Sequence, residues 1–171
     1  MKNKKSLLIG LMLATVIVLF FSGFIQYLLI LLFNAEVEKF QFSMFAFSPN
    51  FNLAENSNIY LNTVLFLLPI LINLSIMEFS IFVLGKLPLG VWRYSLIVCL
   101  VIMAGYIIVF TFYGMIELII APLNNSIWSK VTRLWELDGT QIYVFVSFTL
   151  LVLFTYLQFF QKRLMQYLAN E

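Results

Sequence analysis

The sequence has no histidine and a single cysteine, and each shortage excludes a class of chemistry. Without histidine there is no imidazole to ligate haem or zinc, or to act as a general acid or base. Cys99 has no second cysteine with which to form an internal disulfide, and its apolar surroundings indicate a small packed residue. Neither a glycine-rich phosphate loop nor a Gly-x-Ser-x-Gly elbow occurs. We therefore expect no catalytic centre, no metal and no cofactor.

Charge is also scarce, and this shortage defines the class of protein. Charged residues make up 11% of the 171 residues, hydrophobic residues make up 63%, and the mean hydropathy is +1.00. An average soluble domain is about 25% charged. The composition excludes an ordinary soluble enzyme and a disordered chain, and the net charge of +2 is too small to indicate nucleic-acid binding. It predicts an integral membrane protein in contact with membrane lipids.

Four long apolar runs predict four transmembrane helices, at residues 6–33, 60–84, 95–121 and 141–160. Each run reaches the roughly 20 residues that a helix needs to cross the hydrocarbon core. The first run is much longer than the apolar core of a signal peptide and has no A-x-A-like site after it, so we interpret it as a retained anchor. With no internal repeat, residues 1–171 are predicted to form one all-α domain, a four-transmembrane-helix bundle.

The distribution of basic residues predicts the orientation. If both chain ends and the loop at residues 85–94 are cytoplasmic, seven of the ten basic residues lie inside: Lys2, Lys4, Lys5, Lys86, Arg93, Lys162 and Arg163. Lys39, Lys130 and Arg133 then lie outside, which agrees with the positive-inside rule. The Lys-rich start lacks the character of a transit peptide. We expect a multi-pass protein of the bacterial cytoplasmic (inner) membrane with both termini cytoplasmic.

The first and third loops carry their own patterns. In the first, residues 38–44 alternate apolar and polar and Ser48-Pro49-Asn50 is a turn signal, which is consistent with a hairpin over the bundle or with an interfacial segment. In the third, apolar residues at helical spacing predict a short amphipathic helix on the outer membrane surface, or else an ordinary connector: Ile127, Val131, Leu134 and Trp135. Ser126 could begin this helix and Gly139 end it, with Trp128 and Trp135 as interfacial anchors.

Each apolar run also carries polar residues at helical spacing. The four lines are Thr15, Ser22 and Gln26; Asn62, Pro69, Asn73 and Ser80; Cys99, Tyr106, Tyr113 and Glu117; and Ser147, Thr155 and Gln158. Because lipid tails cannot satisfy these groups, we expect the lines to face other helices, as packing contacts or as the lining of a cavity or pathway. Pro69 removes a backbone donor, so the second run should bend and expose a carbonyl near Asn73.

Glu78 and Glu117 are carboxylates at membrane depth, which makes them functional candidates. Their positions in oppositely running helices imply a depth difference of roughly 14 Å, whereas two-acid sites need about 5–9.5 Å. Each must therefore find its own partner. Tyr113, one turn earlier, can donate to Glu117. Glu78 points away from the Asn73 line, so it meets a different helix or a second protein, with Lys86 also within reach.

Two short fragments resemble the site-2 intramembrane metalloproteases. Met77-Glu78-Phe79-Ser80-Ile81 stands where that family has His-Glu-x-x-His, and Leu137-Asp138-Gly139 resembles its Leu-Asp-Gly motif. Met77 and Ile81 replace both zinc-binding histidines, so the resemblance implies at most an inactive relative.

Three functional hypotheses follow. The first is a non-catalytic accessory or structural subunit of a larger inner-membrane assembly, bound to other membrane subunits or to copies of itself through its abundant aromatic residues. The second is a small transporter or a proton or ion pathway that uses Glu78, Asn73 and Glu117. The third is an enzyme or an inactive relative of an intramembrane metalloprotease.

Overall fold

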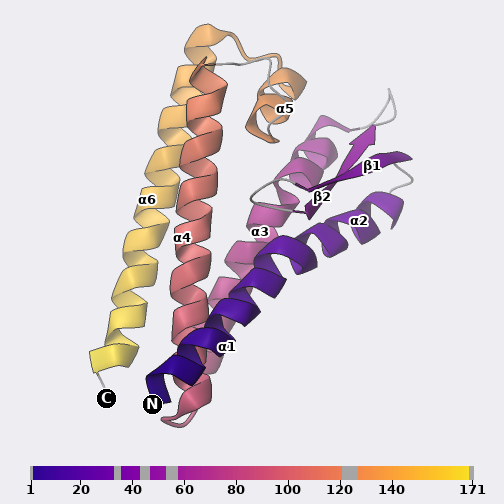
Figure 1. Ribbon diagram of the computed structural model, residues 1–171. Helices are drawn as coiled ribbons and strands as arrows, with labels where there is room; N and C mark the ends of the chain where they lie inside the picture. The colour runs from indigo at the N-terminus through magenta and orange to yellow at the C-terminus, as the bar shows by residue number, and fades with distance from the viewer. Residues whose placement is uncertain (1, 33–35, 43–46, 53–57, 121–126, 170–171) are drawn as a thin grey trace.

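The N-terminal apolar run folds as three consecutive helical segments. The computed structural model describes residues 2–32, 36–42, 47–52, 58–120 and 127–169. Helix α1 spans Lys2–Val16, the π-helical segment η1 spans Ile17–Phe21, and α2 spans Ser22–Leu32. Figure 1 shows them following one another from the N-terminus toward the opposite end of the molecule. A π segment widens the helical turn locally, so it divides the run into two shorter α-helices.

Small residues bring α1 close to α4, which spans Val91–Ile120. Ser6, Gly10 and Ala14 recur every four residues on the buried side of α1. At Gly10 an added Cβ would lie 2.6 Å from the Ser95 carbonyl oxygen, so only glycine fits at this distance. Cys99 is 2% exposed at the same contact, which confirms the prediction of a small packed residue. Such spacing of small residues is how membrane helices approach closely.

Helix α3 spans Ile59–Leu84 and runs back toward the end where α1 begins. Its first turn is capped by Asn58, whose side-chain oxygen accepts a hydrogen bond from the Tyr60 amide at 2.9 Å. A short turn then leads into α4. There Arg93 donates from Nη2 to the Tyr167 carbonyl at 2.9 Å, near the end of the last helix. A cation at that position compensates the helix dipole.

The loop between the first two runs contains an antiparallel hairpin, so the fold is not purely helical. Strand β1 spans Glu36–Phe42 and β2 spans Phe47–Asn52, with Phe42 opposite Phe47 and Val37 opposite Phe51. Of the two interpretations that the alternating pattern allowed, the structure has the hairpin, and it lies beside α2. The predicted turn at Ser48-Pro49-Asn50 is wrong because these residues belong to β2 and pair with residues of β1.

The third loop contains the expected short helix, α5, at Ile127–Leu134. It ends earlier than predicted: Glu136 adopts φ 50°, and the Leu137 amide donates to the Thr132 carbonyl at 3.0 Å. This is a Schellman ending with glutamate in the left-handed position. Gly139, predicted to end α5, instead begins α6 (Gly139–Ala169). Ser126, the predicted start, lies outside the described residues.

The start of α6 is fixed by a reciprocal cap. Asp138 Oδ1 accepts from the Gln141 amide at 2.8 Å, and Gln141 Oε1 accepts from the Asp138 amide at 3.1 Å. The two side chains satisfy amides that would otherwise lack a partner at the helix start. The last helix continues to Ala169, beyond the span of 141–160 predicted from hydropathy.

Helix α5 packs against the bundle at the end opposite the chain termini. It contacts both α3 and α4, and Figure 1 shows it between them at the end opposite the termini. Its buried residues are Trp128, Ser129, Val131 and Thr132. The short amphipathic helix was therefore predicted correctly, and two short polar side chains and a glycine on α4 let it pack against α3 and α4. Its expected place at the membrane surface stays a prediction.

The main core lies between α1, α3, α4 and α6 near the termini. Met77, Leu84, Leu100 and Met103 are fully buried there, with Phe160 of α6 packed against them. Two smaller clusters lie toward the end opposite the termini and include residues of α5: Ile30, Leu65, Phe66 and Val131 in one, and Met115, Leu118, Trp128 and Val146 in the other.

Within the described residues, three helices are long and apolar enough to cross a membrane: α3, α4 and α6. The remaining predicted span, the N-terminal run at residues 6–33, is interrupted by η1. Its apolar helix Gly23–Leu32 is too short to be counted with these three. Four helices able to cross a membrane were thus predicted, and three of the described helices have the length and composition to do so. The start of α1, the α3–α4 turn and the end of α6 all lie at one end of the molecule (Figure 1).

Candidate functional site

Glu78 takes part in a polar cluster that joins α3 to α6. Its carboxylate accepts two hydrogen bonds from the Arg163 guanidinium, from Nη1 at 2.7 Å and from Nη2 at 2.6 Å. The Tyr156 hydroxyl donates a third, at 2.8 Å to Oε1. The paired geometry is the strongest form of arginine–carboxylate contact. The Glu78 and Arg163 side chains each remain 40% exposed.

The partner of Glu78 was not identified from the sequence, although an unspecified different helix was one of the expectations. Arg163 was assigned to a cytoplasmic tail, whereas α6 continues through it. Tyr156 and Arg163 are seven residues apart, two turns on the same side of α6. Lys86, which was expected to be within reach of Glu78, instead places Nζ 4.1 Å from the centre of the Phe82 ring. Extending the helical period of the fourth run past residue 160 could have indicated Arg163.

A second polar contact joins α2 to α3, one turn before Pro69. Because Pro69 has no amide hydrogen, the carbonyl of Leu65 loses its helical donor, and Gln26 of α2 donates to this carbonyl at 2.9 Å. Asn73 is fully buried and donates to the Pro69 carbonyl at 2.9 Å. A carbonyl without a helical donor therefore exists, but it lies at Leu65, one turn before the proline, and not near Asn73 as predicted, and a neighbouring helix satisfies it.

Glu117 and Tyr113 lie near the other end of α4. Glu117 is partly buried, and Tyr113 is 51% exposed. Glu78 is six residues from the end of α3 and Glu117 is 26 residues from the start of α4, so at about 1.5 Å per residue the carboxylates lie roughly 30 Å apart along the bundle. The structure does not bring the predicted polar residues into one site. The expected Tyr113–Glu117 hydrogen bond stays a prediction.

The two tryptophans expected at the interface have different positions. Trp128 is only 5% exposed and packs onto Gly114 of α4, where an added Cβ would lie 2.2 Å from its Cδ1. Its indole is thus packed between helices, and its expected position in the headgroup layer stays a prediction. Trp135 is 39% exposed and donates from Nε1 to Thr63 Oγ1 at 2.8 Å, which attaches the end of α5 to α3.

An apolar cavity of about 190 Å³ adjoins the Glu78 cluster through Tyr156. Four helices line it, with Leu74 from α3, Ile107 from α4, Trp128 from α5 and Tyr156 from α6 among the lining residues. Tyr156 therefore forms part of the cavity wall with its ring and closes the polar cluster with its hydroxyl.

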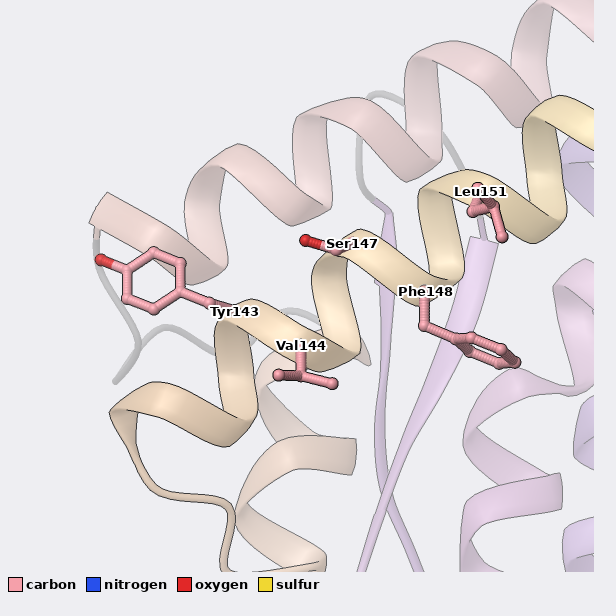
Figure 2. Close-up of a pocket in the computed structure, with 5 residues that line it drawn as sticks. All are labelled: Tyr143, Val144, Ser147, Phe148 and Leu151. Atoms are coloured by element: carbon pink, nitrogen blue, oxygen red, sulfur yellow. The ribbon is translucent and has the colours of Figure 1, made fainter.

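The polar line of α6 does not face the bundle as expected. Ser147, Thr155 and Gln158 are exposed, and only Thr155 has a hydrogen bond in the described part of the chain, to its own Leu151 carbonyl at 2.8 Å. Figure 2 shows the part of this face nearest the start of α6, a shallow groove on consecutive turns of the helix. Its lining consists of Tyr143, Val144, Ser147, Phe148 and Leu151.

The residues of the fragments that resemble the metalloproteases take part in core packing and helix capping in this structure. Met77 and Ile81 are buried in the apolar core, and Asp138 caps α6. Among residues 2–32, 36–42, 47–52, 58–120 and 127–169, no group of three metal-ligating side chains comes together. Comparison of the chain with protein families, curated proteins and solved structures found no match in any of the three.

Proposed function

We propose that this chain is a non-catalytic integral membrane protein that serves as an accessory or structural subunit of a larger assembly in a bacterial inner membrane. The observation that carries this proposal is the uncovered face of α6. In the most apolar part of α6 only 11% of residues are buried, against 33% for α3 and for α4. A partner protein would cover this face.

The chemistry of that face favours protein over lipid as its cover. Ser147 and Gln158 point outward among large apolar side chains such as Phe148 and Phe154, which are 65% and 63% exposed. Hydrocarbon offers no hydrogen-bond partner to an amide or hydroxyl, whereas a neighbouring helix does. Exposed aromatic side chains add the kind of anchor that protein interfaces use.

The arrangement of the carboxylates supports a structural role over an ion pathway. A pathway needs a sequence of groups close enough to exchange an ion, and Glu117 is roughly 30 Å from Glu78 along the bundle. Glu78 already accepts three hydrogen bonds that join two helices. We infer that Glu78 braces α3 against α6 and so holds the outward face of α6 in position.

We further propose four membrane crossings, with α1, η1 and α2 together forming the first. A helical run over residues 2–32 is long enough to cross the roughly 30 Å core even though a π segment interrupts it. An even number of crossings is consistent with the two chain ends at one end of the molecule (Figure 1). The positive-inside rule then assigns that end to the cytoplasm.

Native mass measurement after gentle detergent extraction tests the proposed function. We expect a particle whose protein mass exceeds that of one 19.9 kDa chain. A stable single chain that conducts ions or protons in liposomes would contradict the proposal and favour the pathway hypothesis.

A further inference from the structure

The uncovered face of α6 has the spacing of a helix that pairs with another helix. Alternating steps of three and four residues connect seven exposed side chains: Val144, Ser147, Leu151, Phe154, Gln158, Gln161 and Met165. We name this row the α6 seam. A repeat of 3.5 residues keeps one side of a helix against its partner over a long distance, in a left-handed pair.

The seam is separate from the contacts that α6 makes within its own chain. Leu150, Leu157 and Leu164, which also follow one another every seven residues, pack into the chain's own apolar clusters. Phe160 and Tyr156 lie on this inner side as well, the first 4% exposed and the second bound to Glu78. The seam can therefore take a partner without disturbing the bundle.

We propose that the α6 seam pairs with the same seam of a second copy of this chain. The inference rests on the proposed function, because it names the partner for the face that the proposal leaves uncovered. Identical chains have one orientation in a membrane, so a twofold axis along the membrane normal brings each seam residue opposite its own copy.

Gln158 is the reason for proposing a second copy of this chain as the partner of the α6 seam. Its side chain has both a carbonyl acceptor and an amide donor, so two copies related by the twofold axis can exchange two hydrogen bonds. Within the described parts of the chain Gln158 has no hydrogen-bond partner. It occupies the same heptad position as Leu151 and Met165, where a polar residue among apolar ones is known to fix register and number of strands. Gln161, the next residue of the seam, carries the same amide group.

The flanks of the seam are compatible with this pairing. Lys162 is exposed one turn after Gln158, beside the seam and toward the chain end. Two such lysines across a twofold axis would repel each other in hydrocarbon, but a long side chain near a helix end can place its charge in water. Ser147 is small enough to let the two helices approach at the other half of the seam.

Disulfide crosslinking in native membranes tests the pairing. With Cys99→Ser as background, Leu151→Cys places a thiol on the seam, and Phe159→Cys is the matched control, exposed at 61% on the same helix but off the seam. On mild oxidation we expect Leu151→Cys to give a product of twice the chain mass and Phe159→Cys to remain single. Adding Gln158→Leu to the Leu151→Cys protein should reduce the crosslinked fraction several-fold, and Gln158→Asn should reduce it less.

The possible results separate this inference from the proposed function. Equal crosslinking at Leu151 and Phe159 would indicate random collision and overturn the pairing. Crosslinking of Leu151→Cys to a different protein would also overturn it, while the proposed role as a subunit would stand. Absence of any crosslink, together with a native mass of one chain, would overturn both. An unchanged thermal midpoint of each variant shows that loss of crosslinking is not loss of folding.

Discussion

Replacing Glu78 with leucine should weaken the contact between α3 and α6 by about 2 kcal/mol. The carboxylate accepts from Arg163 at 2.7 and 2.6 Å and from Tyr156 at 2.8 Å. Since both charged side chains are 40% exposed, the ion pair contributes at most about 1 kcal/mol, and the Tyr156 hydrogen bond adds about 1 kcal/mol. Arg163 lies close enough to the end of α6 to reach water once it is unpaired, which limits the loss.

A double-mutant cycle in mixed detergent micelles measures this contribution. Glu78→Leu and Arg163→Leu should each lower the free energy of unfolding, and the double variant should lose about 1 kcal/mol less than their sum because they remove the same interaction. Tyr156→Phe, which removes one hydrogen bond, should lose about 1 kcal/mol. Glu78→Gln should be intermediate, since its amide group places a donor against the guanidinium.

Two results would refute this reasoning. Strictly additive losses from Glu78→Leu and Arg163→Leu would show that the pair contributes nothing to stability. A Glu78→Gln protein that keeps its stability and its assembly but loses function would indicate that the carboxylate must titrate, as the pathway hypothesis requires.

Three further outcomes are expected. Gly114→Ala should lower the thermal midpoint, at a cost of about 1–3 kcal/mol, because its methyl would lie 2.2 Å from Trp128. In the control Gly105→Ala the added methyl meets nothing within 4 Å, so the variant should be neutral or slightly stabilising. Equal midpoints for the two variants would contradict the packing of Trp128. In the same unfolding assay, Asp138→Ala should lower the free energy of unfolding by about 1 kcal/mol because it removes the cap of α6, and Asp138→Asn should retain most of the stability that the cap provides. Equal stability of the two variants would contradict the cap. A reporter active only in the periplasm and fused after the C-terminus should give no signal, and a strong signal would refute the four-crossing topology.

Hydropathy alone was sufficient to locate three of the long helices, and the spacing of apolar residues was sufficient to indicate α5. It was not sufficient for the N-terminal run, because a π segment such as Ile17–Phe21 contains the same apolar residues as a regular helix. It also missed the approach of α1 to α4. The signal was present in Ser6, Gly10 and Ala14 at four-residue spacing, which encodes a close helix contact without changing hydropathy.

The position of α5 depends on a packing detail that periodicity does not report. The sequence indicates which residues of α5 are apolar, but the depth of Trp128 is set by Gly114, a residue on another helix. An indole exposed on the surface of a helix and an indole packed between helices have the same local sequence pattern. Only the complementary glycine distinguishes them.

The partner of Glu78 was missed for a related reason. Charged residues after an apolar run are commonly assigned to a cytoplasmic tail, and Arg163 follows the predicted end of the fourth run. The helix continues instead, because Tyr156, Phe160 and Leu164 still follow one helical stripe that packs against the bundle. The outward direction of Ser147 and Gln158 could not be derived either, since the period of a helix gives the angle between residues but not which side meets the bundle.

Photo-crosslinking from α6 in living cells tests the central claim most directly. A photoreactive phenylalanine analogue at Phe154, which is 63% exposed on the outward face, reports whether protein or lipid covers it. The account predicts a discrete protein adduct from this position on irradiation. Adducts with lipid alone, in cells where the protein is at its natural abundance, would contradict a role as a subunit that assembles through α6.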